Sequence, residues 1–511
     1  MRPVLGISPY KQEKSVLFPV YHNKAGQIIE SNSKSYFFTI IFLTLFIIGI
    51  TIFFAFMIEI NLYIPFNIST YFTLNIINYP LIYTGLLSLI GFGFLYVKPQ
   101  YNRFNSITSV FLIFSFVMLF DFLCFWFFSS IFKKNLNNQK IMINITDLIH
   151  TQWTTLALLI ALGSFIGKID YSELIIFIFI TTITFNVNEQ IIITFIQIMD
   201  LGGSIQVHLF GSSCGIILTW ILSFKNQDQT NHFSRGNYSS ITYSLIGMVF
   251  LWVYYPIFSS MQAKDAPKFN SLLNSILALF SSGYVTFIFS YILNLGFMDI
   301  THILTLTVSG VIMISSVSSI LHSPYIAIII GTCSAIFSTV SNYLFNNALN
   351  CMNLYESIQM LHMHFIPGLF GGITSIIYIL IFDGSSIFTP KYSFQVLQGR
   401  EKSVQALYQL WGLLISLGIG ITTGLILGII FLFFSFCNIP YIRYSDYIYW
   451  KLGDITLFED HSLKIKKIQP LSPTPVEIPP LSVGGIKPFG QEMSLNNINP
   501  PPSFRIGQVL L

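Results

Sequence analysis

Twelve apolar segments of membrane-spanning length follow one another through this 511-residue chain, and they constrain its fold more than any other feature. A helix needs about 20 predominantly apolar residues to cross a bilayer. Only 9% of the residues are charged, against roughly 25% in an average soluble domain. The sequence therefore predicts an all-α membrane protein with spans at 36–60, 79–97, 107–132, 148–167, 172–198, 204–224, 240–261, 271–295, 301–321, 324–346, 362–382 and 407–437.

The ends of this array divide the chain into three predicted parts. Residues 1–35 are polar and show no cleavable signal peptide, so the first span is interpreted as an anchor. Residues 36–437 form the predicted transmembrane domain. Residues 438–511 form a tail that becomes rich in proline, which favours irregular conformations. An even number of spans puts both end segments on one side, and their Lys and Arg residues favour the cytosol.

Other broad classes of function find little support in the sequence. The Lys and Arg residues are scattered and form no nucleic-acid footprint, and the formal net charge is only +4. The five cysteines lie in or beside apolar segments without a CxxC pair, which is typical of buried small side chains. We find no nucleotide-binding loop and no nucleophile–base motif. The sequence predicts a protein that resides in the lipid bilayer and is not an enzyme. It also predicts no cofactor, no bound metal and no nucleic-acid partner.

Ionisable side chains at membrane depth are costly, and they mark candidate functional sites. The strongest candidate is the run Asp200-Leu-Gly-Gly-Ser-Ile-Gln-Val-His208, in which small residues leave room beside an imidazole. A packing role and a pore role both remain open for His208. Glu189 and Asp200 flank one short connection, and their carboxylates could instead cap helix N-termini, where negative charge is favoured. Asp121 lies in a Phe-rich span with no partner evident from the sequence.

Six stretches, in order along the chain, resemble motifs of the Rhesus glycoproteins in the ammonium transporter/Rhesus superfamily. Asp200–Gly211 is similar to the motif of the family's fifth span. The others resemble its first pore helix, its sixth, eighth and tenth spans and its tail: Tyr79–Val97, Leu251–Ser259, Met298–His302, Met363–Gly368 and Tyr444–Trp450. The resemblance covers about residues 36–452, and the extra first span is a trait of the Rhesus branch.

The resemblance implies a homotrimer of eleven-helix bundles with an inverted pseudo-repeat, each with one extra N-terminal span. It also implies one narrow hydrophobic pore per subunit, passing ammonia or ammonium, with carbon dioxide as a further candidate. On the matching positions His208 is the first of two pore histidines, Trp153 holds the outer gate and Phe258 is the inner gate ring. Asp200 matches an acidic residue near the outer vestibule.

Departures from the family pattern leave two functions open. Counted back from Pro367, the second pore histidine falls on Leu361, so we expect His208 to face Leu361, with His364 as its nearest hydrogen-bonding neighbour. A Trp at position 153 adds bulk and also a stronger cation–π surface. One function is a channel or transporter for ammonia and ammonium. The other is a transport-silent Rhesus-like structural subunit. Either would be a multi-pass protein of the plasma membrane or of an internal organelle membrane.

Overall fold

The helices of the computed structural model follow the apolar segments of the sequence. Nine helices of the described part are long and apolar enough to cross a membrane, and three shorter apolar helices cover Thr44–Phe53, Thr84–Leu95 and Ile300–Ile314. Each of the twelve predicted segments therefore contains helix, which confirms the all-α membrane fold. The structure describes residues 20–22, 28–30, 41–42, 44–53, 58–60, 84–99, 102–133, 141–143, 145–223, 236–263, 266–381, 400–433, 446 and 450.

The elements alternate between long helices and short irregular turns of helix. The first half of the bundle contains α3 (Arg103–Lys133), α4 (Ile145–Phe165), α5 (Tyr171–Glu189), the π-helices η1 (Gln190–Phe195) and η2 (Ser204–Leu209), and α6 (Phe210–Ser223). The second half contains α8 (Tyr238–Ser260), α9 (Ala266–Leu293), α10 (Ile300–Thr305), the 3-10 helix η3 (Leu306–Val308), α11 (Ser309–Ile314), α12 (Pro324–Cys351), the π-helix η4 (Leu361–Phe365), α13 (Ile366–Ile381) and α15 (Lys402–Phe433).

Four three-residue strands accompany the helices. The strands β1 (Val20–His22) and β2 (Ile28–Glu30) pair antiparallel, whereas β3 (Ile58–Ile60) and β4 (Ile141–Ile143) pair in parallel. β3 lies at the end of the first predicted span, after its helix Thr44–Phe53, so the helix is shorter than the predicted span. β4 precedes α4, and the pairing joins these two parts of the chain. The possible glycosylation sites at Asn67 and Asn144 lie outside the described residues.

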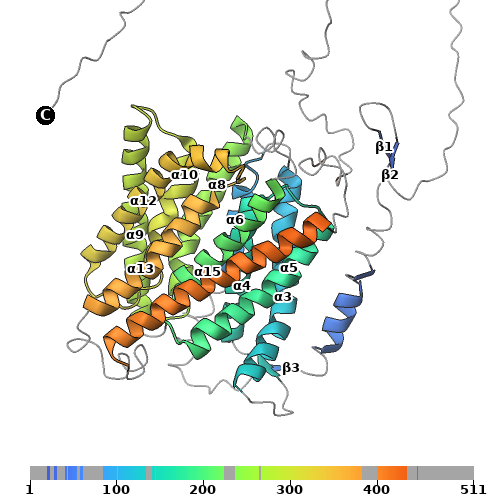
Figure 1. Cartoon of the computed structure of the whole chain (residues 1–511), viewed down its shortest axis with the longest axis horizontal. Helices are drawn as coiled ribbons and strands as arrows, with labels where there is room; N and C mark the ends of the chain where they lie inside the picture. The colour runs from blue at the N-terminus through green and yellow to red at the C-terminus, as the bar shows by residue number, and fades with distance from the viewer. Residues whose placement is uncertain are drawn as a thin grey trace, which may run out of the picture. The chain divides into compact units, whose positions relative to one another are not determined.

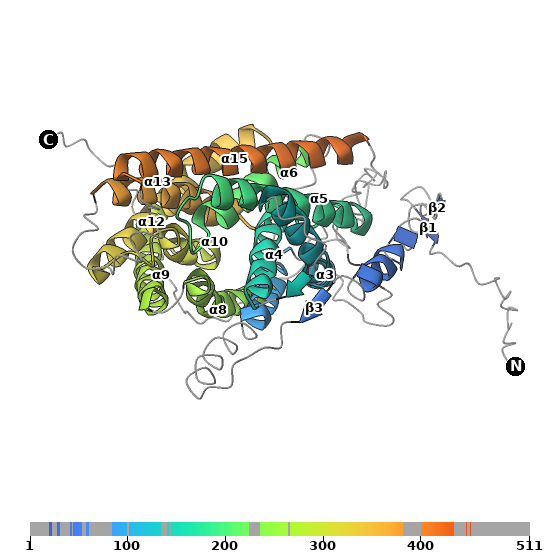
Figure 2. The ribbon, with the colours of Figure 1, turned by 90° about the horizontal axis from the view of Figure 1, so that it is seen from below.

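Close helix contacts hold α6 between α4 and α15. Figures 1 and 2 show α15 lying along one side of the bundle, beside α6 and α13. A Cβ added at Gly211 would lie 2.5 Å from the carbonyl oxygen of Ala157 in α4, and one at Gly424 of α15 would lie 2.6 Å from that of Cys214 in α6. Small residues permit this backbone approach in membrane helices. The position of α6 fixes the π-helix η2 that leads into it.

The first span packs on α3 through aromatic rings. The ring of Phe46 stacks on that of Phe116 with centroids 4.1 Å apart, and it meets Phe120 edge-on. Leu45 and Ile52 of the same helix are largely exposed. One face of this helix therefore contacts the bundle while the other is free for lipid, which fits the extra N-terminal span expected at the periphery.

A contact from beyond the last helix closes the start of α3. The carboxylate of Asp446 accepts hydrogen bonds from the backbone N–H groups of Arg103, Phe104 and Asn105 at 2.8, 3.0 and 2.9 Å. The indole N–H of Trp450 donates to Asn105 Oδ1 at 2.7 Å. Asp446 and Trp450 belong to the compact unit that contains the bundle. The predicted boundary at residue 437 stays a prediction.

Candidate functional site

Two π-helical segments bring two buried histidines together. His208 belongs to η2 and His364 to η4. Their Nδ1 atoms lie 3.1 Å apart, and the two rings stack with centroids at 5.1 Å and an interplanar angle of 14°. The second ring nitrogen of His364, Nε2, lies 3.2 Å from the hydroxyl of Tyr255 in α8. Helical turns of the π type are frequent at functional sites, so we take this pair as the centre of the candidate site.

The pairing confirms one half of the expectation for His208 and corrects the other. His364 was expected to be its nearest hydrogen-bonding neighbour and makes that bond directly. Leu361 was expected to face His208, but the ring that stacks on His208 is that of His364. Leu361 is the first residue of η4, where its backbone N–H donates to the carboxylate of Glu356 at 3.0 Å. The expectation treated residues 361 and 364 as sharing one face of an α-helix. In a π-helix the backbone hydrogen bond spans five residues instead of four. Side chains three residues apart, such as those of residues 361 and 364, therefore point in more different directions than they do on an α-helix.

The hydrogen bonds allow two arrangements of protons on neutral rings. If Tyr255 donates to His364 Nε2, the Nδ1–H of His364 donates to His208 and the Nε2 atom of His208 carries a proton. If His364 donates to Tyr255 instead, His208 donates through Nδ1, and its Nε2 atom is a bare acceptor. This Nε2 atom has no hydrogen-bond partner among the described residues. It can therefore offer a solute either a donor or an acceptor.

The run between Asp200 and His208 folds as a capped turn. Gly203 has φ +83°, a left-handed conformation that glycine adopts readily. One oxygen of Asp200, Oδ2, accepts from the backbone N–H groups of Ile205 and Gln206 at 2.9 and 2.8 Å. The capping role considered for Asp200 is therefore confirmed. Its other oxygen, Oδ1, is buried and has no partner in the part of the chain that the structure describes.

Aromatic rings continue from the histidine pair toward α4. The ring of Phe258 lies edge-on to His208 with centroids 6.4 Å apart, and the indole of Trp153 lies 5.2 Å from Phe258 on the far side. Both aromatic side chains are fully buried. The indole N–H of Trp153 finds no acceptor among the described residues. The structure thus brings three of the expected site residues together: the ring of Phe258 contacts both His208 and Trp153.

A second polar cluster lies between α3, α4 and the end of α5. The Nδ1 atom of His150 lies 2.8 Å from Asp121 Oδ2, and its Nε2 atom contacts the carboxylate of Glu189. Asn186 donates to the other oxygen of Asp121 at 2.7 Å. The capping role considered for Glu189 is wrong, because its side chain makes no cap bond at η1 and pairs with His150 instead. If both carboxylates are ionised, His150 must donate from both nitrogens and be an imidazolium.

Glu356 anchors the start of η4 from the connection that precedes it. Its carboxylate accepts from the hydroxyl of Ser164 at 2.9 Å as well as from Leu361. Lys168, in the turn after α4, donates to the carbonyl oxygen of Tyr355. Burial raises the pKa of Glu356 to about 7 and lowers the pKa of Lys168 to about 7, while the charge of each group opposes the shift of the other. Both groups therefore titrate near neutral pH.

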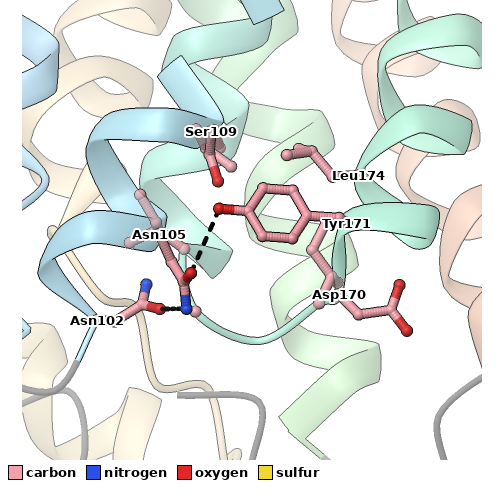
Figure 3. A pocket seen from close by; sticks show the side chains of 10 residues that line it. Asn102, Asn105, Ser109, Asp170, Tyr171 and Leu174 are labelled. Atoms are coloured by element: carbon pink, nitrogen blue, oxygen red, sulfur yellow. Dashed lines mark hydrogen bonds between the residues drawn. The ribbon is translucent and has the colours of Figure 1, made fainter. Parts of the chain in front are cut away.

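A small pocket lies away from the histidine pair, where α3 and α5 begin. Its volume is about 20 Å³, which is room for one water molecule. Figure 3 shows Tyr171 reaching across it to Asn105, and the phenol donates to Asn105 Oδ1 at 3.3 Å. Neither pore histidine lines this pocket. We assign it to the joint between these helices, which also receives the hydrogen bond of Trp450.

The fold and the site together define a multi-pass membrane protein with a buried histidine pair beside the aromatic rings of Phe258 and Trp153. Residues 23–435 match the model of the Ammonium Transporter Family, and the chain belongs to that family. Its similar relatives place it in the Rhesus branch. It is 28% identical to ammonium transporter Rh type C of Xenopus laevis over 381 residues, which cover 72% of this chain and 79% of that protein. It is 26% identical to human Rh type C over 416 residues, covering 79% and 86%.

Solved structures agree with this fold. The Rh50 protein of Nitrosomonas europaea, from a study of conduction by Rhesus channels, superposes with a TM-score of 0.63 at 21% identity, covering 77% of this chain and 96% of that one. Mep2 of Saccharomyces cerevisiae superposes with a TM-score of 0.52 at 16% identity, covering 68% and 84%. These likenesses establish the shared helical bundle.

Sequence reasoning missed two partners that the structure supplies. Tyr255, which bonds His364, lies inside the stretch Leu251–Ser259 that resembles the family, but nothing in its spacing pointed to a histidine 109 residues away. His150 lies three residues before Trp153, and its partners come from two other helices. Contacts of this kind depend on how helices pack, which the pattern of a single helix does not reveal.

Proposed function

We propose that this protein is a channel for ammonia, supplied as ammonium, with its pore at the His208–His364 pair. The observation that carries the proposal is the hydrogen bond between two buried imidazoles from two different spans. In surroundings that are otherwise aromatic and aliphatic, the pair offers hydrogen bonds to a small neutral solute. An ion would lose its hydration there without a charged partner, which is far more costly. Such a site favours ammonia over ammonium and over metal cations.

Trp153 at the proposed gate and the carboxylate of Asp200 can both attract an approaching cation. The unpartnered oxygen of buried Asp200 is an acceptor for ammonium, and the indole of Trp153 offers a cation–π surface. Ammonium would release its proton to water on this side of the gate, and ammonia would then pass Trp153 and Phe258 to reach His208. Carbon dioxide, which is small and apolar, is a further candidate for the same path. We propose that the protein assembles as a homotrimer with one such pore in each subunit.

The transport-silent alternative rested on Leu361 in place of a second pore histidine. Because His364 supplies that second imidazole, the reason for preferring a structural subunit is gone. No other feature of the described residues favours it. The conducting function is therefore the one that the geometry supports.

Proteoliposomes on an ammonium gradient test the proposal. We expect wild-type protein to change the internal pH faster than empty liposomes. His208→Ala and His364→Ala should each change the ammonia flux roughly tenfold, the scale of one lost hydrogen bond of about 1–1.5 kcal/mol. A potassium-leak assay run in parallel separates lost conduction from lost selectivity. Leu361→Ala is the matched control, and its flux should stay near that of wild type. Wild-type flux no greater than that of empty liposomes would overturn the conducting function.

A further inference from the structure

A third buried histidine, His362, lies two residues before His364 in η4 but belongs to another environment. Its side chain is 1% exposed. Its Nδ1 atom lies 2.9 Å from the hydroxyl oxygen of Ser341 in α12. Its Nε2 atom is buried and has no hydrogen-bond partner among the described residues. Leaving a buried polar atom unpaired costs about 1–3 kcal/mol, so this nitrogen calls for a partner.

The proton on His362 can be placed from the bonds of Ser341. The hydroxyl of Ser341 donates to the backbone carbonyl oxygen of Ser338 at 2.9 Å. When the single proton of this hydroxyl lies on that carbonyl oxygen, the oxygen of Ser341 accepts from the Nδ1–H of His362. In the neutral ring the other nitrogen, Nε2, is then a bare lone pair. It needs a donor, and it cannot act as one itself.

A donor without a partner lies on the neighbouring turn of α12. The hydroxyl of Ser338 is buried and unpaired in the described part of the chain. Ser338 precedes Ser341 by three residues, and side chains at this spacing on a helix are neighbours, with Cβ atoms about 5–6 Å apart. Ser334, one turn further along the same face, also has an unpaired buried hydroxyl. Because His362 contacts Ser341, its unpaired nitrogen belongs to a ring that packs on the same stretch of α12 as these unpaired hydroxyls.

The nearby His302 shows that the unpaired nitrogen of His362 is specific to that residue. His302 is also buried, but both of its ring nitrogens have partners. Nδ1 lies 3.1 Å from the hydroxyl of Ser290, and Nε2 lies 3.0 Å from the side-chain oxygen of Asn342, the residue after Ser341. Two histidines therefore flank the same stretch of α12, and of these two only His362 leaves a ring nitrogen for a further molecule.

We propose that His362 Nε2 and the Ser338 hydroxyl form a second binding site for ammonia, between η4 and α12 and distinct from the His208–His364 pair. An ammonia N–H would donate to His362 Nε2, and the ammonia lone pair would accept from Ser338. Ammonium has no lone pair and cannot accept that second bond, so the site selects the neutral molecule. Water has the same donor and acceptor pattern and is the competing occupant. The choice of ammonia rests on the proposed function.

Two substitutions at position 362 separate binding from structural support. In His362→Asn the side-chain amide nitrogen takes the place of Nδ1 and keeps the bond to Ser341, but nothing replaces Nε2. In His362→Gln the longer side chain brings an amide oxygen to the place of Nε2. We expect His362→Asn to lower the ammonia flux in proteoliposomes roughly fivefold, the effect of one lost hydrogen bond. His362→Gln should stay near wild type. Asn at the wild-type rate, or equal losses in Asn and Gln, would overturn the proposal.

Ser338→Ala removes the donor on the other side of the bound molecule. Two residues that hold one molecule are coupled, so their effects on flux are not additive. We expect the double variant His362→Asn/Ser338→Ala to lose little more than either single variant. Losses that multiply would indicate two independent effects and would contradict a shared site.

Nitrogen-15 NMR of histidine-labelled protein in liposomes detects binding without flux. The Nε2 resonance of His362 is assigned by its loss in His362→Asn. At pH 9, where ammonia is abundant, we expect this resonance to shift in ammonium chloride but not in sodium chloride of equal concentration. An unchanged resonance means that the site is empty or holds water, and it overturns the proposal. A shift without wild-type flux would instead overturn only the conducting function, so the two failures are distinguishable.

Discussion

The indole of Trp153, the proposed gate residue, has a large volume, a π surface and an N–H group without an acceptor in the described structure. Replacing it with phenylalanine shrinks the ring beside Phe258 and removes the N–H. We expect Trp153→Phe to raise the maximal ammonia flux, because the narrowest part of the path widens. We also expect a higher ammonium concentration at half-maximal flux, because a phenyl ring attracts cations less than an indole does. A concentration series of flux in proteoliposomes gives both quantities.

Trp411→Phe is the matched control for this change. Trp411 lies on α15 and is 53% exposed, so the same substitution there leaves the gate untouched. Its flux curve should superpose on that of wild type. A lower maximal flux for Trp153→Phe, with the control unchanged, would mean that the indole assists passage and does not limit it.

The single residues of the site could be predicted to different degrees. His208, Trp153 and Phe258 were predicted to belong to one site, and their rings do lie in contact, while their roles in a pore stay predictions. The hydrogen-bonding neighbour of His208 was predicted as His364, which is the partner in the structure. The expectation that His208 faces Leu361 was wrong, because His364 of the π-helical η4 takes that place. The pairing of Asp121 with His150 could not be predicted, since it depends on the rotation of α3 against α4.

At the level of elements, Asp446 is a cap supplied from a distant part of the chain. It satisfies three backbone N–H groups at the start of α3, which lack partners within the helix. Burial raises the pKa of this carboxyl, and the three N–H groups oppose that rise. Asp446→Ala should therefore lower stability by about 0.5–2 kcal/mol, the usual cost of a lost cap. Thermal unfolding in detergent, followed by tryptophan fluorescence, measures the loss.

Asp446→Asn is the conservative partner of that variant. Asparagine keeps one acceptor oxygen and caps helices about as well as aspartate, so we expect a midpoint between those of wild type and Asp446→Ala. If Asn and Ala lower the midpoint equally, the negative charge and not the capping geometry provides the stabilisation. An unchanged midpoint for Asp446→Ala would show that the contact does not stabilise α3.

The elements themselves differ in how far the sequence determines them. Long spans such as α3 and α15 could be predicted because an uninterrupted apolar segment of about 20 or more residues is typical of a helix that crosses a bilayer. The π-helical turns η2 and η4 could not be predicted, because they arise where a capped turn and a close neighbour reshape the first turn of a helix. In η2 the shaping residues are Gly203 and Asp200, and both were noticed in the sequence without their geometric effect.

At the scale of the whole molecule, the outer faces of several helices remain apolar and uncovered within one chain. Val249 of α8, Tyr284 of α9 and Ile329 of α12 are each more than half exposed. Contiguous exposed apolar surface marks contact with lipid or with another subunit. The proposed homotrimer would cover part of this surface, and lipid the rest. The contacts that hold the trimer would then lie between spans, at membrane depth.

Truncation after Lys467 tests where the trimer contacts lie. The proline-rich segment that follows cannot build a packed interface unaided, whereas the apolar helix faces remain intact in the truncated protein. We expect the truncated and full-length proteins each to give the mass of three chains by native mass spectrometry in mild detergent, with the truncated trimer lighter by its three missing tails. Unchanged thermal unfolding of the truncated protein serves as the control for folding. Monomers from a folded truncated protein would move the assembly contacts into the tail and refute a trimer built on the spans.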